Sequence, residues 1–131
     1  MLSVLNGLQE IKEDEDKSIL VAVHDAARPC LDLKDLLGLM GKAQDEIKED
    51  GEGCYLSYQP TESVNLVKNE KVQKSLDRNN VWLSATPQVF CLEDLLSALT
   101  KANDDEKVFT DEVSAMLHYF CLLYTSDAAD D

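Results

Sequence analysis

A short apolar run that ends abruptly in charged residues constrains the fold of this chain more than any other feature. Residues 19–23 read Ile-Leu-Val-Ala-Val, which is typical of a buried β-strand, and His24-Asp25-Ala26-Ala27-Arg28-Pro29 follows directly. Pro29 fixes the backbone and discourages the strand from continuing. Because ligands of open α/β sheets bind outside the carboxyl ends of the strands, this acid and this guanidinium can hold a metal-phosphate, a sugar hydroxyl or both.

Helical and strand-like patterns alternate along the rest of the chain. Apolar residues recur at helical spacing over 3–11, 33–47 and 92–102 and again after Thr110, whereas strands are predicted over 54–58 and 81–86. Pro87 is expected to end the second of these strands. Asp32 and Thr110 are the expected N-caps of the helices that follow them. The alternation predicts an α/β fold with a mostly parallel sheet and helices on both faces.

Two short alternating runs, 64–67 and 72–76, flank the polar tip Lys68-Asn69-Glu70-Lys71 and predict a β-hairpin. Few large apolar residues lie on either strand of this hairpin. We therefore expect an arm, over about residues 61–78, that reaches out of the core.

Composition narrows the class of protein. The 131 residues suffice for one domain. The 26 acidic and 12 basic residues give a net charge of −14 without a basic patch, which argues against a nucleic-acid polymer as partner. No apolar run approaches the roughly 20 residues of a membrane helix, and the start does not resemble a signal peptide. We therefore expect a cytoplasmic protein with no membrane contact.

The four cysteines argue against a zinc centre. They form no Cys-x-x-Cys pair, and two histidines accompany them. Buried free thiols in a reducing compartment are the expected state of Cys30, Cys54, Cys91 and Cys121.

Both ends of the chain are unusual. The five glycines are scattered and form no glycine-rich turn of the kind that meets nucleotide phosphates. Residues 121–131 can be encoded by a transposase-type library adapter read in frame. We therefore expect a non-native tail over 121–131 and a partial natural domain over 1–120.

Several short segments follow one another in a distinctive order and spacing. They are Ser3-Val4-Leu5-Asn6-Gly7-Leu8, Val23 to Pro29, Asp77-Arg78-Asn79, Thr86-Pro87-Gln88, and Thr110-Asp111-Glu112 with Ser114-Ala115. This order resembles the 2-C-methyl-D-erythritol 4-phosphate cytidylyltransferases of the non-mevalonate isoprenoid pathway. The resemblance runs over about residues 3–120.

The resemblance implies a Rossmann-like nucleotidyltransferase. Such an enzyme transfers CMP from CTP to 2-C-methyl-D-erythritol 4-phosphate, releases pyrophosphate and uses a divalent metal, usually Mg²⁺. The acid and the arginine at the end of the strand fit phosphoryl-type transfer, because in such a reaction the protein mainly positions groups and neutralises charge. The family's N-terminal glycine-rich loop and its C-terminal end are absent from this sequence. We therefore expect an incomplete domain that is itself inactive.

The resemblance also assigns roles to residues of the domain body. Ser3 would touch the nucleotide, and Asp25 and Arg28 would lie at the sugar-phosphate end, near the metal-bound phosphates. Asp25 is the one candidate ligand of the metal itself. Thr86 would bind substrate, and Thr110 would bind a hydroxyl of the methylerythritol unit.

Two further roles fall on the arm. By resemblance, Arg78 would be the catalytic residue that holds the substrate phosphate in line with the α-phosphorus of CTP. Ser63 stands where the family often has a substrate-binding threonine. In the family this arm reaches into the neighbouring subunit, which implies a homodimer with shared sites.

Simpler roles exist for most of these residues. Asp25 could cap the following turn, Arg28 could be a structural ion-pair partner, and Thr110 could be a helix cap. Arg78 could be a solvated charge. His24 reads as a packing residue at the end of a strand rather than as a catalytic base.

Two other functions also fit the sequence. A pentitol-phosphate cytidylyltransferase shares the scaffold and the CTP chemistry but accepts another polyol. A non-catalytic α/β domain could use the hairpin for dimerisation alone, and would tolerate the loss of Asp25 and Arg28.

Overall fold

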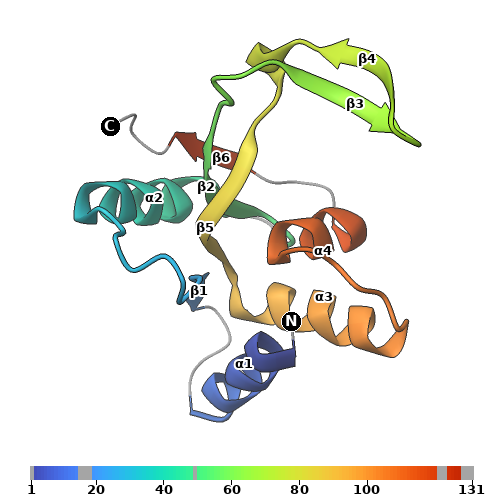
Figure 1. Cartoon of the computed structure of the whole chain (residues 1–131). Helices are drawn as coiled ribbons and strands as arrows, with labels where there is room; N and C mark the ends of the chain where they lie inside the picture. Colours follow the sequence, from blue (N-terminus) through green and yellow to red (C-terminus); the bar gives the residue numbers. More distant parts are fainter. Residues whose placement is uncertain (1, 15–18, 49, 121–123, 128–131) are drawn as a thin grey trace.

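The main sheet holds the molecule together. The computed structural model describes residues 2–14, 19–48, 50–120 and 124–127 (Figure 1). Four of the described strands form one sheet in the order β1-β5-β2-β6. These strands are β1 (Leu20–Val23), β2 (Gly53–Tyr58), β5 (Leu83–Cys91) and β6 (Tyr124–Asp127).

The pairing of the strands corrects one prediction. β5 pairs antiparallel with both β1 and β2, and only the pair of β2 with β6 is parallel among the described strands. β1 and β2 do run in the same direction, as a strand–helix–strand unit requires, but β5 lies between them. Within the described residues the sheet is therefore mixed rather than mostly parallel, because the chain leaves through β2, forms the arm and returns through β5.

Helices cover both faces of this sheet, as predicted. α1 (Leu2–Asp14), α3 (Leu92–Asp104) and α4 (Glu112–Tyr119) lie on one face, and α2 (Leu33–Glu46) lies on the other (Figure 1). One hydrophobic core lies on each face of the sheet. Neighbouring residues of β5 contribute to different cores, since Phe90 packs among the three helices and Val89 packs against α2. The period-two alternation of a strand produces this division. The fold is therefore α/β.

The N-cap of α2 is the one that the sequence predicts. The carboxylate of Asp32 accepts a hydrogen bond of 2.7 Å from the backbone N–H of Lys34. The predicted cap of α4 is wrong by one residue. Asp111, not Thr110, accepts from the backbone N–H of Ser114, because a carboxylate at this position reaches the free N–H groups of the first turn.

Pro87 does not end a strand. β5 runs through it to Cys91. Tyr55 of β2 pairs with Gln88 and Ser57 with Ser84, so residues 85–87 of β5 stand opposite a single residue of β2. This β-bulge accommodates a residue that has no N–H to give to the ladder.

The predicted hairpin is confirmed. β3 (Val64–Lys68) and β4 (Lys71–Leu76) form a separate antiparallel pair that projects from the body (Figure 1). Asn69 and Glu70 both have positive φ, which is typical of a tight two-residue turn. Most residues of the hairpin are exposed, and a short 3₁₀ turn, η1 (Arg78–Asn80), follows it.

Some of the remaining sequence predictions are confirmed, some are wrong, and some lie outside the described residues. Cys54 is buried as expected, and burial raises the pKa of its thiol. Cys91 is only partly buried, and Cys30 is exposed, since it follows the turn outside the sheet. Cys121 lies outside the described residues, and so does much of the predicted tail, whose residues 124–127 pair with β2 as β6. None of the helices in the described residues is both long and apolar enough to span a membrane.

At Gly51 both the backbone conformation and a neighbouring side chain require glycine. Its φ is +84°, and an added Cβ would collide with the ring of Phe120. We expect Gly51→Ala to lower the free energy of unfolding by about 2 kcal/mol or more, since both backbone strain and a collision oppose it. Urea denaturation of the chain measures this. Gly38→Ala in α2, where a Cβ meets nothing within 4 Å, is the control, and equal stabilities for the two variants would refute this expectation.

Candidate functional site

An open cleft of about 550 Å³ lies at the carboxyl end of β1. The loop after β1 forms one wall, the middle of β5 forms the floor, and the starts of α1 and α4 complete the lining. This is the edge of the sheet at which the sequence places the candidate ligand site. Five of the seven predicted site residues line the cleft: Ser3, Asp25, Arg28, Thr86 and Thr110.

Asp25 and Arg28 belong to one tight turn after β1. The Asp25 Oδ1 atom accepts a hydrogen bond of 3.1 Å from the backbone N–H of Ala27. The backbone N–H of Arg28 donates to the Asp25 carbonyl at 3.0 Å. Oδ2 of Asp25 lies 3.6 Å from Nε of Arg28, with both side chains about half exposed. Asp25 therefore does cap its turn and Arg28 does form an ion pair, yet both remain open to a ligand.

Thr86 and His24 fasten this turn to the sheet. The backbone N–H of Asp25 donates to Thr86 Oγ1 at 3.1 Å, and Thr86 Oγ1 lies 3.1 Å from His24 Nδ1. His24 Nε2 lies 2.8 Å from the carbonyl oxygen of Arg28. A carbonyl can only accept, so Nε2 carries the proton and the Thr86 hydroxyl donates to Nδ1. His24 is thus an exposed bridge, not the packing residue that its sequence position suggests.

The start of α4 forms the opposite wall. Thr110 Oγ1 lies 3.1 Å from the hydroxyl of Ser114, and that hydroxyl donates to Asp111. Thr110 is exposed.

Tyr55 of β2 is uncharged near the cleft. Burial raises the pKa of the Tyr55 hydroxyl, its hydrogen bond with Ser84 lowers that pKa, and the Asp111 carboxylate raises it further. Tyr55 therefore contributes no negative charge here near neutral pH.

The two arm residues do not line this cleft in their own chain. Arg78 is exposed in the 3₁₀ turn after β4, where its guanidinium donates to the backbone carbonyl of Thr61. Ser63 is exposed immediately before β3.

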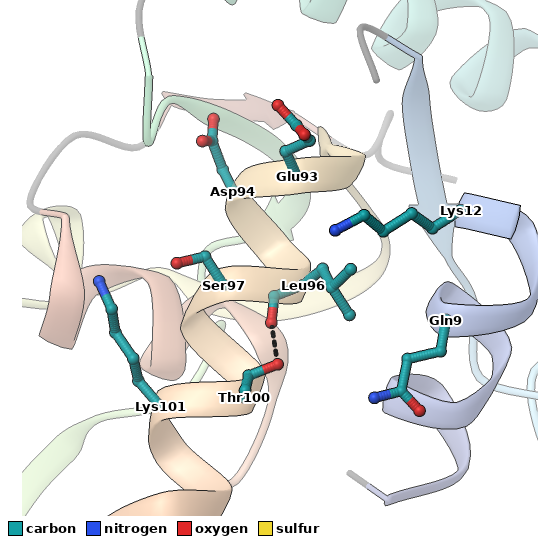
Figure 2. A pocket seen from close by; sticks show the side chains of 8 residues that line it. All are labelled: Gln9, Lys12, Glu93, Asp94, Leu96, Ser97, Thr100 and Lys101. Atoms are coloured by element: carbon teal, nitrogen blue, oxygen red, sulfur yellow. Dashed lines mark hydrogen bonds between the residues drawn. The ribbon is translucent and has the colours of Figure 1, made fainter. Parts of the chain in front are cut away.

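A larger groove, of about 930 Å³, lies between α1 and α3, but its chemistry is less suited to a ligand. Figure 2 shows that Lys12 points from α1 towards α3, whereas Lys101 and Ser97 project from another side of α3. The Thr100 hydroxyl already donates to the Leu96 carbonyl at 2.7 Å. The polar groups of this groove diverge, while those of the cleft at β1 converge.

Fold and cleft together define an α/β domain with an open cleft at the carboxyl end of a strand, the place where ligands of such sheets bind. Residues 1–121 match the sequence model of the family described as IspD, 2-C-methyl-D-erythritol 4-phosphate cytidylyltransferase. The chain belongs to this family.

Individual relatives agree with this assignment. The cytidylyltransferase of Ruthia magnifica is 32% identical over 118 residues, and that of Haemophilus influenzae Rd is 37% identical over 115 residues. These matches cover 90% and 87% of this chain but 48% and 47% of the relatives. The chain therefore spans about half the length of the curated relatives that it matches.

A solved structure supports the fold. The cytidylyltransferase of Francisella tularensis superposes with a TM-score of 0.82 at 29% identity, over 98% of this chain and 58% of that one. The protein from Anaerococcus prevotii, at 21% identity, shares the fold with a TM-score of 0.80.

Three residues that build the cleft are not identified from the sequence: His24, Gln88 and Asp111. Their contacts join segments that are far apart in sequence, such as His24 with Thr86, 62 residues later. The Thr-Pro-Gln segment is the one available signal for Gln88, and a carboxylate one residue after Thr110 is the signal for Asp111.

Thr86 can be tested as the anchor of the turn. Thr86→Val keeps the shape of the side chain but removes the acceptor for the Asp25 N–H and the donor to His24. We expect a loss of about 1 kcal/mol in the free energy of unfolding, measured by urea denaturation of the chain. Thr86→Ser keeps the hydroxyl and serves as the control. Equal losses in the two variants would show that packing, not the hydroxyl, matters.

Proposed function

We propose that the protein to which this chain belongs transfers CMP from CTP to 2-C-methyl-D-erythritol 4-phosphate in the cytoplasm, as a step of isoprenoid precursor synthesis. Membership of the family supports this proposal. The observation that carries it is the cleft itself, because five residues to which the family resemblance assigns substrate or nucleotide contacts line one cavity.

The proposed reaction is an in-line displacement. An oxygen of the methylerythritol phosphate attacks the α-phosphorus of CTP, the bond from that phosphorus to the bridging oxygen of the β-phosphate breaks, and pyrophosphate leaves with the bonding electrons. Catalysis of this kind rests on alignment and charge neutralisation. Arg28 can neutralise a phosphate oxygen, and the hydroxyls of Thr86 and Thr110 can orient the polyol.

The charge of the residues that line the cleft indicates which further groups the binding of CTP requires. The lining includes the carboxylates of Asp25, Asp111 and Glu112 but a single guanidinium, that of Arg28. A triphosphate needs more positive charge than this lining offers. A divalent cation and basic residues from the remaining half of the full-length protein are the proposed sources. For this reason we expect the 131-residue chain alone to be inactive.

The residues fit Mg²⁺ only in one way. No group of three His, Cys, Asp or Glu side chains in the described part of the chain could hold a metal ion. Mg²⁺ is often bound by one or two carboxylates together with substrate phosphates. Asp25 could supply one oxygen, since its side chain is half exposed, Oδ1 accepts the hydrogen bond within the turn, and Oδ2 lies 3.6 Å from Nε of Arg28. Mg²⁺ would neutralise phosphate charge and polarise the α-phosphorus.

The arm is the proposed dimer contact. Leu66, Val67 and Val72 are large apolar residues that the hairpin leaves exposed. Arg78 and Ser63 lie outside the cleft of their own chain. If these apolar side chains were buried against a second subunit, both residues would lie near the partner's cleft. The absence of both residues from the cleft of their own chain supports such a shared site.

Substitutions of Asp25 and Arg28 in the full-length protein test the proposal. Asp25→Asn keeps an oxygen that can cap the turn at Ala27 but removes the charge. We expect this variant and Arg28→Ala each to lower kcat/KM by about 100-fold, because charge at the reacting phosphates is lost. A pyrophosphate-release assay measures the effect.

Lys34→Ala, in the first turn of α2 and outside the cleft, is the matched control and should retain wild-type activity. Wild-type turnover in both Asp25→Asn and Arg28→Ala would instead favour a non-catalytic dimerisation domain. A wild-type protein that uses a pentitol phosphate in place of methylerythritol phosphate would favour the other cytidylyltransferase.

A further inference from the structure

We infer that Gln88 is a positioning residue, whose buried amide fixes Thr110 at the start of α4 against the strand that carries Thr86. The inference rests on the proposed function for the identity of the substrate. Its structural basis is independent of that function.

Gln88 is 1% exposed, and both the nitrogen and the oxygen of its side-chain amide form hydrogen bonds. Nε2 donates to Asp111 Oδ2 at 3.2 Å and to the carbonyl oxygen of Ala85 at 3.3 Å. Oε1 accepts from the backbone N–H of Val113 at 3.0 Å. One side chain of β5 thus binds the first turn of α4 at two points and its own strand at a third.

These contacts complete the cap of α4 from outside the helix. The first N–H groups of a helix have no intrahelical acceptor, and Val113 is one of the residues concerned. Asp111 serves Ser114 with Oδ1, so the Val113 N–H depends on Gln88. Val113 is buried, and a buried N–H without a partner is costly, which makes this orientation of α4 preferred over a shifted one.

The amide therefore sets the width of the cleft. Thr86 lies two residues before Gln88 on β5, and Thr110 directly precedes Asp111. The two hydroxyls, that of Thr86 on the floor of the cleft and that of Thr110 on the wall formed by the start of α4, are the proposed polyol contacts. Ser3, the proposed nucleotide contact, comes from α1 and is not held by this amide. Loss of the amide should therefore disturb binding of the polyol phosphate more than binding of CTP.

Steady-state kinetics of the full-length protein test this difference. We expect Gln88→Met, which keeps length and apolar volume, to raise KM for methylerythritol phosphate roughly tenfold and KM for CTP by less than about twofold. A purely structural role would lower the active fraction, and so the apparent kcat, without moving either KM. Gln9→Met on α1, an exposed position, is the control.

A swap of donor and acceptor provides a second test if Gln88→Met folds poorly. Gln88→Glu sets a carboxylate against Asp111, and Asp111→Asn sets two amide donors against each other. In the double variant, the amide introduced at position 111 can donate to the carboxylate introduced at position 88 and still cap Ser114. We expect each single variant to raise KM for methylerythritol phosphate and the double variant to recover part of that loss, because the carboxylate at position 88 still cannot donate to the Ala85 carbonyl.

Amide hydrogen exchange of the 131-residue chain separates this inference from the proposed function. Val113 should exchange at least about tenfold faster in Gln88→Met than in the wild type, because its acceptor is gone. Unchanged protection of Val113, equal changes of both KM values, or additive effects in the double variant would overturn the inference. If the full-length wild type transfers no CMP, the proposed function fails and the exchange result alone decides the role of Gln88.

Discussion

The insertion of β5 between β1 and β2 is the constraint on which the rest of this structure depends. It places Thr86 beside the end of β1, where the threonine hydroxyl accepts a hydrogen bond from the backbone N–H of Asp25. It also places Gln88 against α4, where the Gln88 amide accepts a hydrogen bond from the backbone N–H of Val113. Without that strand, the turn after β1 and the start of α4 would have no common support.

The elements that the sequence predicts well are those fixed by local chemistry. Asp32 caps α2 as expected because a cap needs only the next three residues. The strand at 19–23 and the hairpin tip are equally local. The direction of strand pairing is not predictable in this way, since nothing near β1 reveals that β5, more than 60 residues later, becomes its neighbour.

The residues of the candidate site follow the same rule: those with local sequence signals are predictable, and those that depend on distant contacts are not. Asp25 and Arg28 are visible in sequence because they close an apolar run. The bridging role of His24 is not visible, since it requires Thr86 from a distant strand. The cap predicted at Thr110 is provided by Asp111, because both residue types suit that position and only the course of the chain decides between them.

We propose that the turn after β1 and the start of α4 enclose the polyol phosphate. A crystal structure of the full-length protein with bound 2-C-methyl-D-erythritol 4-phosphate tests it most directly. We expect the ligand between Thr86 and Thr110, within hydrogen-bonding distance of the Asp25–Arg28 turn. A ligand bound in the groove between α1 and α3, with this cleft empty, would show the claim to be wrong.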